Sequence, residues 1–398
     1  MMGDKKTTSP VDSKLCTGCG LCSDICPTQA ISMQPDAILG HLRPQININQ
    51  CMNCGLCERK CPCANPVDKY QIQEAYAAWA KEDDKHYSSS SGGIASIIYE
   101  YTIREGGVIA GVQMKGVSHP TFECSDSMQI IETFKRSKYI QVDHNGIYKA
   151  ILKELKAGRF VAFIGLPCQC AAMKRIAEGI DENLLLVDLV CHGTPSFKVF
   201  SEYVYAITQS PDVEVSFRDP KKGVVLSIYK DGNAIYNRTM REDPYLTAFM
   251  EGNLFAECCY NCIYACENRV GDFTIGDFWG LGEKVPFDYK VSRVSAVLIN
   301  SDKGRYYFDK LSKDIKQVKR DAVEAINGNN QLQKPSKKGA NRDIVISSIS
   351  NGNSAGDIIL KLYGKTTNKV YKKRVLKATV KRIGKALGLK KIKDLIKG

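Results

Sequence analysis

The chain has 398 residues, of which 43% are hydrophobic and 25% charged, an ordinary globular composition with room for two or three domains. No run of about 18 apolar residues predicts a membrane span, and the opening MMGDKKTTSPVDSK lacks the apolar segment of a secretory signal, so we expect a cytoplasmic protein. The net charge of +13 arises in residues 361–398, which hold 14 Lys and Arg against one Asp, so the rest of the chain is neutral and gives no nucleic-acid-binding signal.

A four-cysteine pattern occurs twice near the start, as CTGCGLCSDICP in residues 16–27 and as CMNCGLCERKCP in residues 51–62. Both copies have the C-x2-C-x2-C-x3-C-P spacing of bacterial ferredoxins, in which the fourth cysteine of each copy reaches the other cluster. Zinc is the alternative, but zinc sites usually take two pairs of ligands rather than three plus one. We predict two 4Fe-4S clusters, one bound by Cys16, Cys19, Cys22 and Cys61 and the other by Cys51, Cys54, Cys57 and Cys26.

Seventeen cysteines in a chain without a secretory signal favour metal-bound thiolates over disulfides, because a reducing cytosol keeps thiols reduced. We assign residues 1–66 to a two-cluster ferredoxin domain. Cys63 has no predicted role and is interpreted as a small apolar residue.

Helical periodicity begins after the repeat, in YQIQEAYAAWAKED, and predicts a connecting helix over residues 67–86. Its apolar face would consist of Ile72, Ala75, Tyr76 and Trp79. Helices and short apolar strands then alternate, which indicates a mostly parallel sheet with helices on its faces. The predicted helices are 94–107, 146–158, 168–179 and 196–207, and the predicted strands are 108–114, 159–166 and 184–192.

The second half begins with a predicted β-hairpin in residues 224–238, with Asp231-Gly232 at the turn. A second group of cysteines, CCYNCIYAC, fills residues 258–266 and precedes another predicted strand. Residues 326–358 are rich in Asn, Gly and Ser and are predicted to form a surface linker.

Six motifs follow one another in the body of the chain. They are SSGG (90–93), SKYIQ (137–141), GLPCQ (165–169), VDLVCHGTPS (187–196), FRDPKKG (217–223) and CYNCIYA with GDFTIGDFWG (259–280). In this order they resemble the coenzyme F420 hydrogenase/dehydrogenase beta-subunit family. With the preceding repeat, the resemblance covers roughly residues 10–310.

The resemblance implies that residues 87–325 form a domain that binds FAD and iron-sulfur clusters. The implied FAD-site residues are Ser90, Ser91, Gly92, Gly93, Lys138, Tyr139, Gly165 and Pro167. SSGG and GLPCQ are small-residue turns at predicted helix N-termini, where free N–H groups suit a pyrophosphate or a flavin carbonyl. No G-x-G-x-x-G follows a strand, so a Rossmann-type site is not supported.

Two side chains near these motifs are candidates for catalysis. Lys138 would stabilise an anionic reduced flavin, unless it is a solvated surface lysine. His192 would donate a hydrogen bond to the flavin or a cluster, or act as a general acid, unless it is a structural histidine at a strand end.

Family analogy favours Cys168, Cys191, Cys259 and Cys262 as ligands of a third 4Fe-4S cluster beside the flavin. The ends of parallel strands converge on one edge of a sheet, so these distant cysteines could meet there. The alternatives are inert buried cysteines and a zinc site formed by CCYNCIYAC alone. The C-x2-C-x3-C spacing is not the C-x3-C-x2-C of radical S-adenosylmethionine enzymes.

The chain departs from the family pattern at two positions. Val224 replaces the usual aromatic residue, and Ala256 or a neighbour stands where an arginine is usual. Both departures bear on substrate specificity. Asp277 and Trp279 either face the substrate or are simply packed.

The tail, residues 359–398, has an apolar helical stripe and basic residues around it. The stripe consists of Leu376, Val380, Ile383 and Leu387. Such a helix suits the anionic inner surface of a membrane or an acidic redox partner, or remains solvated without a partner. Nucleic acid is not expected, because no aromatic platform accompanies the charge.

The expected fold is an α+β two-cluster ferredoxin-like domain, a mostly parallel α/β flavin-binding domain and a C-terminal basic amphipathic helix. The expected function is a flavin-dependent iron-sulfur oxidoreductase. It would exchange hydride with an organic substrate or coenzyme F420, and single electrons with a ferredoxin-like carrier or a partner redox subunit. The alternative is a non-enzymatic electron-transfer subunit that docks a partner enzyme.

Overall fold

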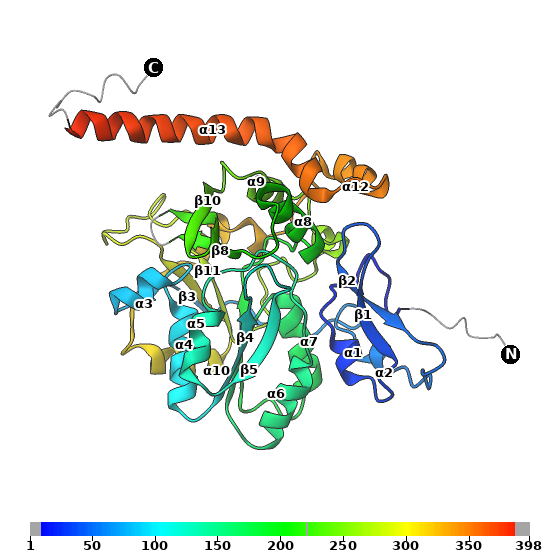
Figure 1. Ribbon diagram of the computed structural model, residues 1–398. Coiled ribbons are helices and arrows are strands. Elements are labelled where there is room, and N and C mark those ends of the chain that lie inside the picture. Colours follow the sequence, from blue (N-terminus) through cyan, green and yellow to red (C-terminus); the bar gives the residue numbers. More distant parts are fainter. Residues whose placement is uncertain (1–8, 220–221, 387–398) are drawn as a thin grey trace.

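The computed structural model describes residues 9–219 and 222–386 of the chain. Figure 1 shows a small N-terminal lobe in blue, a large sheet flanked by helices, and a third part that carries the C-terminal helix. Among the described helices, none combines the length and the apolarity needed to cross a membrane.

The N-terminal lobe consists of two short helices and an antiparallel pair of strands. Its elements are α1 (Leu21–Ile25), β1 (Ile31–Pro35), β2 (Leu42–Ile46) and α2 (Leu56–Arg59). Each helix follows a glycine in the left-handed conformation, Gly20 with φ of 82° and Gly55 with φ of 65°. The cysteine-containing turn of each repeat therefore leads directly into a helix.

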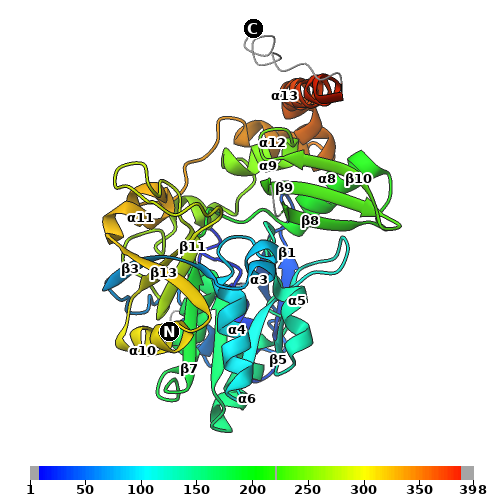
Figure 2. The ribbon, with the colours of Figure 1, turned by 90° about the vertical axis from the view of Figure 1, so that its left-hand side faces the viewer.

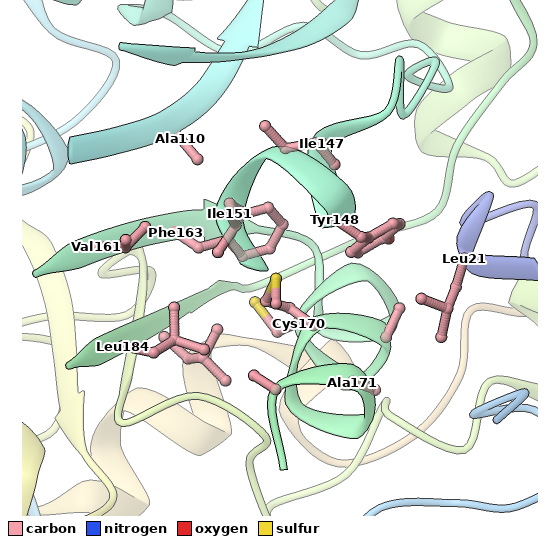
Figure 3. Packing of buried hydrophobic residues seen from close by; sticks show 14 of the residues in the cluster. Leu21, Ala110, Ile147, Tyr148, Ile151, Val161, Phe163, Cys170, Ala171 and Leu184 are labelled. Atoms are coloured by element: carbon pink, nitrogen blue, oxygen red, sulfur yellow. The ribbon is translucent and has the colours of Figure 1, made fainter. Parts of the chain in front are cut away.

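The lobe docks on the body through buried side chains (Figure 3). Leu21, 1% exposed, belongs to the same hydrophobic cluster as Tyr148 of the body. The Tyr148 hydroxyl donates to the Cys19 carbonyl at 2.9 Å, and its backbone N–H donates to the Asp24 carboxylate at 3.1 Å. His144 lies 3.1 Å from the same carboxylate. Lobe and body thus share one core.

The body is built on an eight-stranded mixed sheet with the order β13-β3-β12-β11-β7-β6-β4-β5. The strands are β3 (Glu74–Ala80), β4 (Val108–Gln113), β5 (Thr121–Ser125), β6 (Val161–Gly165), β7 (Leu184–Leu189), β11 (Phe273–Asp277), β12 (Ser295–Ile299) and β13 (Ile315–Arg320). Only the four central strands, β4, β6, β7 and β11, are parallel to one another, and all the outer pairings are antiparallel. The prediction of a mostly parallel sheet is therefore right for the centre and wrong for both flanks.

The predicted connecting helix over residues 67–86 is wrong. This segment contains β3, which pairs with β12 and β13, and the short helix α3 (Asp83–Ser88). Alanine has a high helix propensity, but Ala75, Ala77 and Ala78 are completely covered between layers, and tertiary burial overrides propensity. Helical spacing of the apolar residues was misleading because both faces of β3 are buried.

Helices cover both faces of the sheet. Val161 and Phe163 of β6 face α6 and α7, whereas Ala162 and Ile164 face α4 and α10. These helices are α4 (Ile94–Arg104), α6 (Ile147–Lys156), α7 (Pro167–Ala177) and α10 (Asp302–Leu311). Shorter helices are η1 (Met128–Ile130), α5 (Ile131–Phe134), η2 (Glu257–Asn261), α11 (Ala322–Gly328) and η3 (Asn330–Leu332).

The third part is a three-stranded antiparallel sheet covered by helices (Figure 2). Its elements are α8 (Phe197–Thr208), β8 (Glu214–Asp219), β9 (Gly223–Lys230), β10 (Asn233–Thr239), α9 (Pro244–Met250), α12 (Arg342–Ser350) and α13 (Ala355–Ala386). Strands β9 and β10 form the predicted hairpin, with positive φ at Asp231 and Gly232.

The predicted surface linker, residues 326–358, is only partly exposed, and many of its side chains pack against the body. It contains α12, whose Arg342 is 3% exposed and donates to the Phe255 carbonyl at 2.8 Å and the Tyr260 hydroxyl at 2.7 Å. The start of α13 is also buried, so the boundary predicted at residue 359 divides a single helix. The high content of Asn and Ser suggested a linker. The prediction was misleading because several polar groups of this segment form hydrogen bonds with the body.

Candidate functional site

Seven of the eight predicted dicluster cysteines form two neighbouring groups, Cys16, Cys19, Cys22 and Cys61 in one and Cys26, Cys54 and Cys57 in the other. Burial, with the nearby Cys16 and Cys61 thiolates, raises the pKa of Cys19 to about 12. Burial also raises the pKa of Cys57, and the charges of the nearby Cys54 and Cys26 thiolates raise it further. In each group, cysteines of one repeat thus lie near the fourth cysteine of the other. Neighbouring thiols that oppose one another's ionisation remain thiolates only when a shared cation compensates their charge.

Backbone amides also point at these sulfurs. The Gly18 N–H donates to Cys16 Sγ at 3.4 Å, and the Ala30 N–H donates to Cys26 Sγ at 3.3 Å. Such contacts tune the potential of iron-sulfur clusters. Among the described residues, no three Cys, His, Asp or Glu side chains converge on one point as ligands of a single metal ion do. The four cysteine ligands of a 4Fe-4S cluster bind four different iron atoms, so they do not converge on a single point.

A cavity in the body, here called the cysteine cavity, is lined by six cysteines from four segments. They are Cys19, Cys168, Cys191, Cys258, Cys259 and Cys262. Cys168 is in the first turn of α7, Cys191 follows β7, and the last three are in or next to η2. The four cysteines favoured for a third cluster are thus brought together with Cys19 of the lobe. Burial raises the pKa of Cys168, and the Cys262, Cys191 and Cys19 thiolates add to it.

A buried ion pair holds the cysteine-rich segment on the sheet. Asp188 of β7 and Arg269 are 0% and 1% exposed, and Arg269 Nη2 lies 2.8 Å from Asp188 Oδ1. Asp188 also accepts from Thr274 Oγ1 at 2.7 Å and from two backbone amides. Arg269 lines the cysteine cavity, and its charge favours the thiolate forms of Cys191 and Cys262, whose pKa values burial raises.

Sequence reasoning missed Arg269. The available signal was Asp188, a carboxylate within the apolar strand LLLVDL. A fully buried carboxylate requires a cationic or hydrogen-bonding partner, although the sequence does not say which residue supplies it.

A second cation reaches the cysteines from the lobe. Arg43 of β2 donates through Nη1 to the Cys16 carbonyl. Burial opposes its charge, but the Cys16 and Cys258 thiolates outweigh burial and raise the pKa of Arg43. Ala256, where the family usually has an arginine, is buried and has no charge. A cation therefore lies beside this cysteine group without an arginine at that position.

A second cavity of about 380 Å³, here called the large cavity, adjoins the cysteine cavity. This volume is within the range of small-molecule sites, roughly 300–1,000 Å³. Both cavities are lined by Leu166, Gln169 and the segment 191–194. The first turn of α4 opens on the large cavity, beginning at Gly93.

Six of the eight predicted FAD-site residues line the large cavity: Ser90, Ser91, Gly93, Lys138, Tyr139 and Gly165. Gly92 instead packs against the sheet, where its N–H donates to Ser295 Oγ at 2.9 Å and a Cβ would lie 2.3 Å from the Ala78 carbonyl. Pro167 lines the cysteine cavity.

Lys138 is not a solvated surface lysine. Its Nζ donates to the carbonyls of Val112, Thr133, Phe134 and Lys135 at 2.9–3.0 Å. Burial lowers its pKa to about 7, whereas four carbonyl dipoles favour the ammonium form. In this geometry the amine connects the end of α5 to β4, with no donor left for a ligand.

His192 lines both cavities, and both of its ring nitrogens are bound to the protein. Nε2 lies 3.1 Å from the Met250 carbonyl and Nδ1 lies 2.6 Å from Gln331 Nε2. A carbonyl accepts only, so Nε2 carries the proton and Nδ1 accepts from the amide. Burial lowers the pKa of His192, which keeps this neutral form.

The remaining candidates line the large cavity. Asp277 pairs with Arg218 at 2.7 Å, and Trp279 is 53% exposed. Val224 also lines this cavity. Arg218 belongs to the FRDPKKG motif (217–223) but was not predicted as a site residue. Its guanidinium lies 5.8 Å from the Tyr139 ring centre.

Comparison with known proteins matches two segments of the chain to families. Residues 15–65 match the 4Fe-4S dicluster domain, and residues 158–324 match the C terminus of the coenzyme F420 hydrogenase/dehydrogenase beta subunit. A curated relative is a subunit of the F(420)H(2) dehydrogenase of Methanosarcina mazei. It is 21% identical over 322 residues, which cover 76% of this chain and 84% of the relative. A similar solved structure is the xenon-derivatised F420-reducing NiFe hydrogenase complex from Methanosarcina barkeri, with 16% identity and a TM-score of 0.45 over 66% of this chain and 91% of that one.

Proposed function

Because the chain belongs to the coenzyme F420 hydrogenase/dehydrogenase beta-subunit family, we propose that it is an iron-sulfur flavoprotein that passes electrons between 4Fe-4S clusters and FAD. It would exchange hydride with an organic substrate or reduced coenzyme F420. Iron-sulfur electron transfer within an oxidoreductase family follows from the matches themselves. The matches do not show FAD binding, hydride exchange or the number of clusters, and these three points are part of the proposal.

One observation supports the proposal most strongly: the cysteine cavity adjoins both the dicluster lobe and the large cavity. Cys19 of the lobe lies in its wall together with Cys168 of the body. On its other side, Cys191 and His192 line both cavities. A group held by the body cysteines would therefore lie between the dicluster lobe and a ligand in the large cavity, as an electron relay requires.

The donor sets fit the proposed groups. Cys16, Cys19, Cys22 and Cys61 would hold one cluster, Cys51, Cys54, Cys57 and Cys26 the second, and Cys168, Cys191, Cys259 and Cys262 the third. Thiolates are the usual ligands of such clusters. The first turn of α4 has backbone N–H groups without intrahelical partners, which suit a pyrophosphate. Bound FAD would supply the exchange between hydride and single electrons.

The side chains at the site would orient and enclose the bound groups and would not take part in the reaction themselves. Lys138 is proposed as a positioning residue that fixes the 137–141 segment in the wall of the large cavity. His192, as a neutral donor to the Met250 carbonyl, fixes the 191–194 segment between the two cavities. These roles are narrower than the predicted stabilisation of a reduced flavin by Lys138 and general acid catalysis by His192.

The proposal is tested by adding a reduced deazaflavin to anaerobically purified Cys168→Ala protein, with Cys170→Ala as the matched control. Both residues are in α7, but Cys170 lies in the hydrophobic core and not in the wall of the cysteine cavity. In Cys168→Ala, flavin absorbance should bleach while the dicluster absorbance persists. In the control both should bleach. Equal bleaching in both variants contradicts the proposed relay.

A second candidate is an electron-transfer subunit without a substrate of its own. The observation in its favour is that the polar nitrogens of Lys138 and His192 are all engaged by the protein. Purified protein that retains its clusters but neither retains FAD nor reacts with a hydride donor supports this candidate.

We also propose a partner and a location for the reaction. The one-electron partner would be a ferredoxin-like carrier or a redox subunit, and the protein would work in the cytoplasm. The relative in Methanosarcina mazei is by name a subunit, which supports a protein partner. Residues 1–66 would form the domain that contacts it, and residues 87–325 the flavin domain, to which β3 contributes an additional strand.

A further inference from the structure

The C-terminal helix α13 has two halves with different surroundings. Its first part packs against α8 and α9, with Ile358, Ile359 and Tyr363 at 6% exposure or less. In Figure 1 the second part lies above the body and runs out beyond β10, and in Figure 2 the helix is seen nearly end-on above the body. Among the described side chains beyond Arg374, residues 375–383, none makes a hydrogen bond, an ion pair or a ring contact with the rest of the chain.

Three contacts fix which side of α13 faces the body. Arg374 Nε lies 2.5 Å from the Glu242 carboxylate. The Arg238 guanidinium lies 3.8 Å from the Tyr371 ring centre and donates to Asn368 at 2.7 Å. The side of the helix that bears Asn368, Tyr371 and Arg374 is therefore the inner side.

The apolar stripe predicted from the sequence lies on the side of α13 away from Arg374, the last described residue of the helix that contacts the body. At 3.6 residues per turn, Leu376 and Ile383 are roughly 160° and 180° around the helix from Arg374. Leu376 is 64% exposed and Ile383 is 51% exposed, and Val380 between them is partly exposed. Leu387, the fourth residue of the stripe, lies outside the described residues. The body therefore leaves this stripe uncovered.

The charge around the stripe is of one sign. Between residues 364 and 386 there are nine basic residues and no acidic residue: Lys365, Lys369, Lys372, Lys373, Arg374, Lys377, Lys381, Arg382 and Lys385. A second copy of the helix would be repelled by this charge. An apolar stripe flanked by basic residues is the pattern of helices that lie in the plane of an anionic membrane surface.

We propose that the free half of α13 binds the surface of a membrane that contains anionic lipids. Leu376, Val380 and Ile383 lie among the headgroups, and the flanking lysines contact lipid phosphates. The first part of α13 is packed against α8 and α9 and keeps the helix attached to the body, so the whole protein is held at the surface. This inference does not depend on which cofactors the chain binds.

Flotation of the full-length protein with lipid vesicles tests the proposal. Vesicles of phosphatidylcholine alone are compared with vesicles that also contain phosphatidylglycerol. The wild type should float with the anionic vesicles only, and added salt should release it. Lys377→Glu with Lys381→Glu should weaken the apparent affinity by roughly 30-fold or more, given the known gain per basic residue near an anionic surface. Leu376→Ser with Ile383→Ser should also weaken it.

Lys149→Glu with Lys153→Glu is the matched control. It makes the same charge change on exposed residues of α6, away from the proposed surface, and should retain binding. An equal loss in this control would overturn the proposal, because it would show an effect of net charge alone. Failure of the wild type to bind anionic vesicles would also overturn it and leave an acidic protein as the partner. Iron content, measured in every variant, separates this outcome from loss of the proposed function.

Discussion

The dicluster lobe and the cysteine cavity both gather cysteines, but they do so by different means. In the lobe, two local repeats within residues 16–61 supply all eight cysteines, and each repeat forms its own turn and short helix. In the cavity, segments far apart in sequence meet because β6 and β7 end at the same edge of the sheet. The first arrangement follows from spacing, and the second requires the fold.

The two regions also differ in what stabilises them. Among the described residues, no hydrophobic cluster belongs to the lobe alone. Leu21 packs in the cluster under α6 and α7, and Leu39 packs in that of the third part. The lobe should therefore depend on its metal ligands and on docking, whereas the cysteine cavity depends on the buried core and the Asp188–Arg269 ion pair.

The largest effect should come from breaking that ion pair. Asp188→Ala leaves the charge of Arg269 buried without a carboxylate to balance it, which costs about 3–5 kcal/mol. Anaerobic urea unfolding should show this loss, and the iron that remains should be that of the lobe. Asp188→Leu combined with Arg269→Met should recover only part of the stability, because the Val270 and Gly271 amides that donate to Asp188 stay unpaired. If the single substitution leaves stability unchanged, the ion pair does not hold the cysteine-rich segment.

Removing the shared core residue should loosen the lobe. Leu21→Ala is expected to cost about 2–4 kcal/mol, because the side chain is 1% exposed and packs on the body. Hydrogen exchange should speed up in residues 9–66 more than in the central strands. Uniform acceleration throughout the chain would contradict separate stabilisation of the two regions.

Two glycines offer a matched test of docking. Gly20 and Gly146 both have positive φ, 82° and 74°. A Cβ on Gly20 would lie 2.1 Å from the His144 ring, whereas a Cβ on Gly146 meets nothing within 4 Å. Gly146→Ala should cost only the left-handed penalty of about 1–2 kcal/mol. Gly20→Ala should cost more and displace the lobe, which a comparison of thermal unfolding checks. Equal costs would mean that Gly20 is needed only for its backbone conformation.

The smallest expected effect is a pH dependence of docking. Burial disfavours the charged form of His144, but Asp143 and Asp24 outweigh it and raise its pKa to about 9. Because this is above the unfolded value of about 6.5, the stabilisation is complete below pH 6.5 and is lost as the pH rises through 9. Proteolysis between lobe and body should increase over this window in the wild type. His144→Gln should flatten this dependence of proteolysis on pH. An unchanged dependence would exclude His144 as the group responsible for it.

Sequence reasoning succeeded where the determinants were local. The hairpin at Asp231-Gly232 and the helices α4, α6 and α7 follow from turn residues and periodicity. It failed at β3 and at residues 326–358, where burial decides the conformation and composition does not. The sequence identified cysteines that the fold brings together. It did not identify Arg269 or Arg43, because no sequence spacing indicates that an arginine will be buried. The engagement of Lys138 by four carbonyls was likewise invisible in the sequence.

The central claim is that the body cysteines hold a cluster between the dicluster lobe and a flavin. Counting iron, sulfide and flavin in anaerobically purified protein tests it most directly. Three cubes and a flavin predict about 12 iron and one FAD per chain. A count of about 8 iron would leave the cysteine cavity without a cluster and contradict the relay, and zinc in place of iron would contradict the whole account.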